Sequence, residues 1–281
     1  MRVLCLLFLA PLTALVACSD DGASVDTAGE ADTDTDTDTD TDADTDTDSD
    51  TDADTGVYGS IEGYVLNPDG TGADGTNLQF CDTLCFNGEA EADGYFFQDE
   101  LEDGSYKVDA IGEIDASNKV SGTGLGHVRV HATIDGANAY TMAESMVLPE
   151  VSSWAELSGS STTFTSPGGD VTLTASASSF TPGFGWDSYG YAAGVVSPVP
   201  AYWEGYEAAI AVAFLPFAAT VNESFSVSFT APAGAAPSYD VYSIDDKGKL
   251  EGPVGTAALT GPDLVIADIE PSLLSWLVLV E

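Results

Sequence analysis

The chain has 281 residues, 44% of them hydrophobic, and its 47 acidic residues against six Lys and Arg give a formal net charge of −41. This length suits one large domain or two small ones, with enough apolar residues for a core. Nucleic-acid affinity depends largely on Lys and Arg at the phosphates, so the charge excludes DNA and RNA as partners and repels anionic lipid head groups.

Residues 3–17, "VLCLLFLAPLTALVA", form an apolar stretch directly after Arg2. The stretch is shorter than a transmembrane helix needs, which predicts a signal peptide over residues 1–17. It ends in Leu15-Val16-Ala17-Cys18, which resembles the bacterial lipobox, with Leu three places before the cysteine and a small residue directly before it. The resemblance implies that Cys18 carries diacylglycerol and becomes the first mature residue. The alternative is an ordinary signal peptide with a chance cysteine.

Lipidation would make the lipid bilayer a partner through the acylated Cys18. Each buried CH₂ contributes about 0.8 kcal/mol, so two or three acyl chains anchor a protein firmly where one does not. Ser19 resembles the residue that follows the cysteine in lipoproteins sorted to the outer membrane. The predicted location is therefore the bacterial cell envelope, as an outer-membrane lipoprotein that is periplasmic or surface-exposed.

Residues 18–56 are predicted to be a disordered acidic linker. Every even position from 32 to 54 is Asp, and most odd positions are Thr. Such a segment buries no apolar surface and is stretched by its own charge, and it can span on the order of 100 Å. Calcium loops also place acids at alternate positions, but they need a turn glycine and a final Glu, which this run lacks. Whether the threonines are glycosylated stays open.

From Val57 onward, short β-prone runs such as "SIEGYVLN", "NLQFCD", "GYFFQDEL" and "SYKVDAIG" alternate with Asp-Gly turns. No window has a convincing helical period. Many short strands separated by turns are typical of a β-sandwich or barrel. We therefore predict an all-β chain with two consecutive β-sandwich domains, at residues 57–150 and 151–281.

Residues 59–112 resemble a carboxypeptidase regulatory-like domain, a transthyretin-like and Ig-like β-sandwich. The resemblance rests on Gly63-Tyr64-Val65, Asp69-Gly70, residues 92–96 ("ADGYF") and residues 101–108 ("LEDGSYKV"). Members of that family are usually non-catalytic modules beside enzymes, receptors or adhesins. The resemblance implies a fold and no active site.

Cys81 and Cys85 flank "DTL" and predict a disulfide, because an exported chain meets an oxidising compartment. "HVRVHATI" (127–134) alternates polar and apolar residues and predicts a strand. On that strand His127 and His131 share a face with Arg129 but stand about 13 Å apart, too far to hold one ion. We expect this face to be a solvent-facing polar edge. "MVLPEV" (146–151) would close the first domain.

The second half belongs to no family that we recognise. Its unusual segment is 184–207, "FGWDSYGYAAGVVSPVPAYWEGYE". Irregular backbone that carries Trp and Tyr is typical of sugar- and protein-binding surfaces. The alternative is that these rings cover the open end of the sandwich. The candidate ligand-binding residues are Trp186, Tyr189, Tyr191, Tyr202, Trp203 and Tyr206.

Weak calcium candidates are Asn67, Asp69 and Asp74 in "NPDGTGADGTN", although turn chemistry explains these residues equally well. The sequence has no nucleophile elbow, no phosphate-binding loop and no zinc-protease motif, and no cofactor is predicted.

The chain is thus predicted to be a membrane-anchored surface lipoprotein that displays β-sandwich domains in a structural or interaction role, and not an enzyme. One alternative is a module that binds a cell-surface glycan or protein through 184–207. A carboxylate-based hydrolase is the other, but acids are so abundant that any chosen pair is arbitrary.

Overall fold

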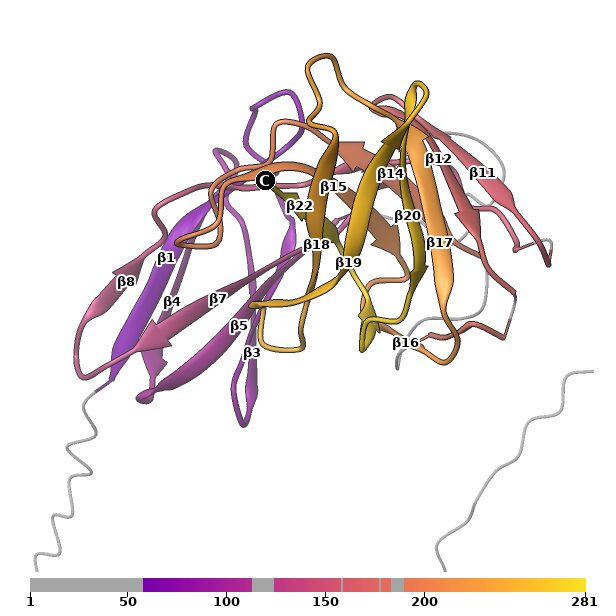
Figure 1. Ribbon diagram of the computed structural model, residues 1–281. Helices are drawn as coiled ribbons and strands as arrows, with labels where there is room; N and C mark the ends of the chain where they lie inside the picture. The colour runs from indigo at the N-terminus through magenta and orange to yellow at the C-terminus, as the bar shows by residue number, and fades with distance from the viewer. Residues whose placement is uncertain (1–57, 113–123, 158, 177, 183–189) are drawn as a thin grey trace, which may run out of the picture. The chain divides into compact units, whose positions relative to one another are not determined.

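Figure 1 shows the computed structural model, which describes residues 58–112, 124–157, 159–176, 178–182 and 190–281. These residues form strands and no helix, so the prediction of an all-β fold is confirmed. Within the described ranges there is accordingly no helix of the length and apolarity that a membrane span requires. The predicted signal peptide, Cys18 and the acidic linker lie outside the described residues.

The first half of the described chain follows the predicted β-prone runs closely. Its strands are β1 (Gly59–Leu66), β2 (Asn77–Cys81), β3 (Cys85–Glu89), β4 (Tyr95–Leu101), β5 (Gly104–Ile111), β6 (Gly124–Leu125), β7 (Val128–Ile134), β8 (Ala139–Thr141), β9 (Met146–Val147) and β10 (Glu150–Val151).

Two sheets enclose the first core. One has the order β4-β1-β8, with β9 also pairing with β1, and the other has the order β3-β2-β5-β7. In β1, Ile61 and Val65 are buried while Ser60, Glu62 and Tyr64 face outward, as period-two alternation requires. Phe80 of β2 and Val108 of β5 join the same core from the opposite sheet. The first half is therefore a β-sandwich.

The turn at Asp93-Gly94 shows why turn chemistry was readable in the sequence. Gly94 has a φ of 86°, and a Cβ there would stand 2.1 Å from the carbonyl oxygen of Val65. The Asp93 carboxylate accepts a hydrogen bond from the backbone N–H of Tyr95 at 3.0 Å. Only glycine adopts this positive φ without strain and leaves room for the Val65 carbonyl oxygen. The hydrogen bond of the Asp93 side chain closes the turn.

The second half continues as strands only. They are β11 (Thr162–Ser166), β12 (Gly169–Thr174), β13 (Phe180–Thr181), β14 (Ala192–Val196), β15 (Ala208–Leu215), β16 (Ala219–Val221), β17 (Phe225–Thr230), β18 (Ser238–Ile244), β19 (Leu250–Thr260), β20 (Asp263–Ile269), β21 (Leu273–Leu274) and β22 (Leu277–Val280).

Nine of these strands make one sheet in the order β11-β12-β17-β20-β19-β18-β22-β15-β14. The sheet curls until β14 lies against β11 and β12 (Figure 1). Buried side chains of this sheet form the second core. The two layers of this second sandwich therefore belong to one continuous sheet. Strands β13, β16 and β21 form a small separate sheet.

The curled sheet also forms a wall of the first core. In β15, Ile210, Val212 and Phe214 belong to the second core, whereas Ala211 and Leu215 belong to the first. Both faces of this strand are buried, which explains its unbroken apolar sequence, because a strand with no solvent face has no need of polar alternation.

The chain near the predicted boundary at residue 150 is bonded to both halves. Strand β10 pairs with β6, and the next residue, Ser152, donates its backbone N–H to the carbonyl of Ala193 in β14 at 2.9 Å. All described residues fall within one compact unit, and the division into two domains stays a prediction.

Candidate functional site

The aromatic segment 184–207 does not form one exposed surface among its described members. Tyr191 is 8% exposed and packs on Phe180 at 5.5 Å between ring centroids. Trp203 is 7% exposed and donates its Nε1–H to the carbonyl of Gly248 at 3.1 Å. Part of the segment is strand β14, so its backbone is more regular than its composition indicates. Trp186 and Tyr189 lie outside the described residues.

The remaining two rings of the segment differ from each other. The Tyr202 hydroxyl accepts the backbone N–H of Val147 at 2.6 Å, and burial raises the pKa of this hydroxyl well above its usual range. Tyr206 is exposed and stands edge-to-face with Tyr242 at 5.2 Å. Among the described candidate residues of this segment, Tyr206 is therefore the one exposed ring that could contact a ligand.

Two of the weak calcium candidates, Asn67 and Asp69, form hydrogen bonds within a turn. Asn67 donates its side-chain N–H groups to Thr71 Oγ1 at 3.1 Å and to the carbonyl of Gly72 at 3.0 Å. Asp69 Oδ1 accepts from the backbone N–H and the hydroxyl of Thr71, and these bonds lower the pKa of the Asp69 carboxyl. Asp74 is exposed. Across the described ranges, no group of three or more His, Cys, Asp or Glu is placed to hold a metal ion.

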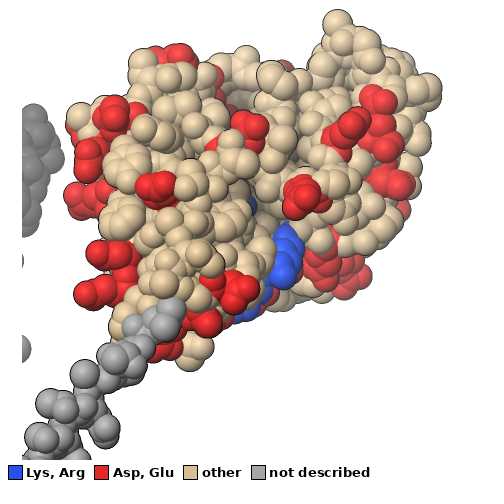
Figure 2. Space-filling model, turned by 90° about the vertical axis from the view of Figure 1, so that its left-hand side faces the viewer, with Lys and Arg blue, Asp and Glu red and all other residues tan. Residues whose placement is uncertain are grey.

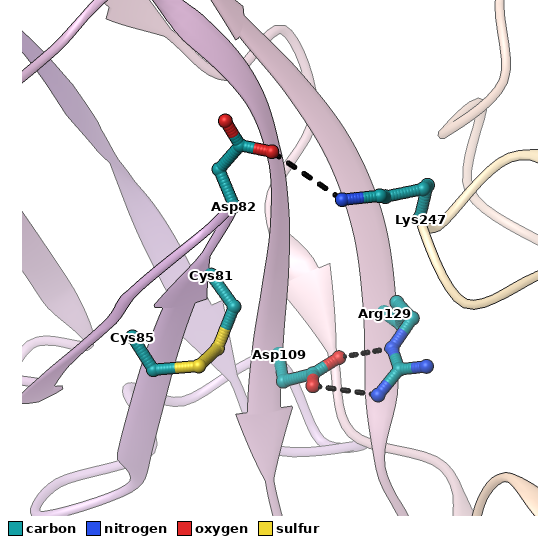
Figure 3. The surroundings of a disulfide bond; sticks show 6 residues. All are labelled: Cys81, Asp82, Cys85, Asp109, Arg129 and Lys247. Carbon is teal, nitrogen blue, oxygen red and sulfur yellow. Dashed lines mark hydrogen bonds and ion pairs between the residues drawn. A yellow bond between two sulfur atoms is a disulfide. The ribbon is translucent and has the colours of Figure 1, made fainter.

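The predicted disulfide between Cys81 and Cys85 is confirmed, with 4.1 Å between the two Cα atoms (Figure 3). It closes the end of the β2–β3 hairpin. Between the two cysteines, the backbone N–H of Asp82 donates to the carbonyl of Leu84 at 3.1 Å. The loop Asp82–Leu84 is thus fixed both by a covalent bond and by a backbone hydrogen bond.

The expectation of a solvent-facing polar edge on 127–134 was wrong for His127 and Arg129, which are both buried. The second half covers this face: Trp276 donates its Nε1–H to the carbonyl of His127 at 2.8 Å, and Arg129 stands 4.9 Å from the centroid of the Phe217 ring. Arg129 also binds both carboxylate oxygens of Asp109, at 2.5 and 2.8 Å (Figure 3). A buried charge needs such a bidentate partner.

The same contacts set the protonation state of His127. Burial lowers the pKa of its imidazole to about 4, an effect that the nearby Asp109 carboxylate only partly offsets. The ring is therefore neutral at pH 7. Its role is packing against Phe217, at 5.8 Å between ring centroids.

The Lys and Arg side chains that the structure describes lie near one another, because Lys107 interacts with Arg129 and Lys247, and His131 interacts with Lys247 and Lys249. They are Lys107, Arg129, Lys247 and Lys249. Figure 2 shows basic side chains gathered in a hollow of a face that carries many acids. Acids lie among them: Asp109 pairs with Arg129, and Asp82 pairs with Lys247 at 3.3 Å (Figure 3). The Asp82–Lys247 pair joins the turn after β18 to the end of the β2–β3 hairpin, whereas the Asp109–Arg129 pair links β5 to β7. Two of the four described basic side chains are thus paired with acids.

A different surface carries exposed aromatic rings. On the solvent side of β1 and β4, Glu62 is paired with Phe97 and Tyr64 is paired with Tyr95 in neighbouring register positions. Phe97 and Tyr64 are 52% and 44% exposed, and the rings of Tyr64 and Tyr95 meet edge-to-face at 5.5 Å. We call these four residues the β1–β4 aromatic face. It arises because both strands place these residues two positions apart, on the side opposite the core.

The carboxylate of this face is held in place by two hydroxyl groups. Tyr95 donates its hydroxyl to Glu62 Oε2 at 2.9 Å, and Thr141 of the adjacent strand β8 donates to Oε1 at 2.7 Å. These bonds, that of Thr141 first, lower the pKa of the Glu62 carboxyl, and the bond to Glu62 raises the pKa of Tyr95. Glu62 therefore stays ionised and fixed. A carboxylate has about four acceptor positions, so two remain for a ligand.

The β1–β4 aromatic face was not predicted from the sequence. The signal was present, because "EGY" (62–64) and "YFF" (95–97) place large rings at outward positions of two predicted strands. What the sequence did not supply was the pairing of β1 with β4, which brings the rings together.

Neither the known protein families nor the curated proteins contain a match to this chain. Among solved structures, similarity is found to a DUF3823 family protein from Parabacteroides merdae, with 10% identity, coverage of 76% of this chain and 97% of that one, and a TM-score of 0.23. A protein described as a putative carbohydrate-binding protein, from Bacteroides uniformis, has 8% identity, 79% coverage of both chains and a TM-score of 0.22.

A D312A variant of BcpA, the major pilin subunit of Bacillus cereus, is similar at 8% identity, with coverage of 79% of this chain and 58% of the pilin and a TM-score of 0.23. At these scores the similarities carry no argument about function, which has to be argued from the residues.

Proposed function

We propose that this chain is a lipid-anchored, non-catalytic binding protein of the bacterial cell envelope, and that its β1–β4 aromatic face binds a saccharide. The proposal joins two features. Cys18 follows a lipobox-like sequence and precedes an acidic linker, and the folded part presents exposed rings around a fixed carboxylate. The confirmed Cys81–Cys85 disulfide agrees with export to an oxidising compartment.

The observation that carries the saccharide proposal is the combination of Glu62 with Tyr64, Tyr95 and Phe97 on one open sheet face. A sugar ring has an apolar face of C–H groups and an edge of hydroxyl groups. Aromatic rings provide a flat apolar contact, and a few fixed polar groups provide orientation. An ionised carboxylate accepts strong hydrogen bonds from hydroxyl donors. This face offers both kinds of contact side by side.

The charge of the chain restricts the chemical class of saccharide that we expect to bind. With 47 acidic residues against six basic ones, the molecule repels anions over much of its surface, and the site itself contains Glu62. We therefore expect a neutral or amine-bearing saccharide, and weaker binding of uronic-acid or sulfated saccharides of the same linkage.

The proposal is tested by applying the full chain, solubilised in detergent, to an array of neutral, amine-bearing and acidic glycans. We expect retention on neutral or amine-bearing glycans, and its loss in Tyr64→Ala and Phe97→Ala. The matched control is Tyr206→Ala, which removes an exposed ring of the 184–207 segment and should leave retention unchanged. Loss of retention in Tyr206→Ala with none in the other two would move the site to that segment.

A further inference from the structure

A cavity of about 250 Å³ lies at the closed end of the β2–β3 hairpin, where β4 turns into β5. Its walls combine rings and an aliphatic side chain, from Tyr58, Leu84, Phe86 and Tyr106. Leu84 is 73% exposed, although it is a large apolar residue in a loop that the disulfide fixes. The cavity is separate from the β1–β4 aromatic face.

The rim of this cavity is acidic. Asp82, Glu100, Glu102 and Asp103 all line it. Asp82 pairs with Lys247, and Asp103 accepts the backbone N–H of Gly136 at 2.7 Å. Four lining carboxylates, one of them paired with Lys247, give this cavity a net negative charge beside its apolar side chains.

The carboxylates of the rim affect the pKa of Tyr106, which also lines the cavity. Its hydroxyl donates to the backbone carbonyl of Glu102 at 3.0 Å. The pKa of Tyr106 is raised, first by burial and then by the nearby carboxylates of Asp82 and Glu102. Burial disfavours a charge of either sign at Tyr106, whereas the carboxylates disfavour a negative charge and favour a positive one beside it.

We propose that this cavity binds an alkylammonium group, held by cation–π and apolar contact with its walls and by charge attraction from its rim. Rings that face a cation attract it, and a substituted ammonium adds apolar surface that a hydrated metal ion lacks. The volume is below that of a pocket for a drug-sized ligand, so it suits a single group. A free quaternary amine and a lysine side chain share this chemistry. The proposal is independent of saccharide binding on the β1–β4 aromatic face.

The test titrates the full chain in detergent with choline, with its neutral isostere 3,3-dimethylbutan-1-ol, and with Nα-acetyl-lysine methylamide, by calorimetry at about 0.15 M salt to screen diffuse attraction. We expect choline or the lysine derivative to bind at least about tenfold more tightly than the neutral alcohol. The tighter of the two cations identifies the source. Binding of neither cation, or equal binding of the alcohol, would overturn the proposal.

A pair of variants separates the cavity from general acidity. Glu100→Gln combined with Glu102→Gln keeps the shape of both side chains and should weaken cation binding about tenfold. The control Glu270→Gln also removes an exposed carboxylate, outside the cavity, and should bind as the wild type does. If the double variant binds as tightly as the control, the cation is held diffusely by the acidic chain and the cavity is not its site.

Discussion

The carboxylates of Glu62 and Asp109 differ in burial and in their hydrogen-bond partners. Asp109 is buried and satisfied by the two guanidinium nitrogens of Arg129, so its acceptor capacity is used inside the fold. Glu62 lies on an outward-facing position and accepts hydrogen bonds from two hydroxyl groups of the described residues, those of Tyr95 and Thr141. The first is structural because breaking a buried pair leaves an uncompensated charge. The second keeps capacity for an external donor.

At the same scale, His127 makes stability depend on pH. Its pKa is lowered from 6.5 to about 4 by burial, so the unfolded chain binds a proton more readily than the folded one between these values. The contribution of neutral, buried His127 to the free energy of unfolding is therefore complete above pH 6.5 and is lost as the pH falls toward 4. We expect His127 to account for a loss of about 2–3 kcal/mol in the free energy of unfolding between pH 7 and pH 4.5.

The measurement compares urea unfolding of the wild type and of His127→Gln at both pH values. The variant has no titrating group at this position, so its pH dependence should be smaller by that amount, whatever its stability at pH 7. Equal pH dependence in the two proteins would show that His127 is not held in its neutral form by the fold.

Among the elements, β15 and β19 mark what sequence patterns can and cannot predict. The run "AIAVAFLPF" (209–217), which contains most of β15, is apolar throughout and does not reveal that the two faces of the strand belong to different cores. The sequence of β19, "LEGPVGTAALT", contains Gly252, Pro253 and Gly255 and lacks alternation, so local patterns do not predict a strand there. The structure gives one reason: a Cβ at Gly255 would stand 2.4 Å from Cγ2 of Ile269. Glycine there permits close approach of β20.

The site residues also divide into those that local sequence patterns predict and those that depend on contacts between distant parts of the chain. Outward positions of β1 and β4, and the disulfide, follow from local spacing, which the sequence contains. The burial of His127, Arg129 and Trp203 depends on contacts with residues far away in the chain, such as Trp276 and Gly248. Local periodicity carries no information about such contacts, so polar and aromatic residues that looked exposed are part of the packing.

The shared wall gives a prediction at the scale of the element. Leu215 of β15 is fully buried in the first core, and Ile210 of the same strand is buried in the second. Leu215→Ala and Ile210→Ala should each lower the free energy of unfolding by about 2–5 kcal/mol. Because one strand supports both cores, each variant should still unfold in a single transition, at the same temperature by tryptophan fluorescence and by circular dichroism. Two separate transitions, with only one shifted by either variant, would contradict a shared wall.

For the whole molecule, we propose that a lipid anchor at Cys18 and an acidic linker precede the β-structured part of the chain. Mass spectrometry of the protein extracted from its native membrane should find Cys18 as the first residue, with acyl chains added. Cys18→Ala should abolish that modification and move the protein from the membrane fraction to the soluble fraction, since the acyl chains supply the membrane affinity. An unmodified amino terminus in the wild type would remove the anchor from the account.

Saccharide binding by the β1–β4 aromatic face is the central claim, and one affinity comparison tests it most directly. The best glycan from the array is titrated into the full chain, into the double variant Tyr64→Ala with Phe97→Ala, and into Tyr206→Ala. Because both substituted rings are exposed and outside the core, the melting temperature should change little. We predict at least about a tenfold loss of affinity in the double variant and none in Tyr206→Ala, since burying roughly 60 Å² of apolar surface against the two rings is worth about 1.5 kcal/mol, which is about tenfold in affinity. Equal affinity in all three proteins would contradict the claim.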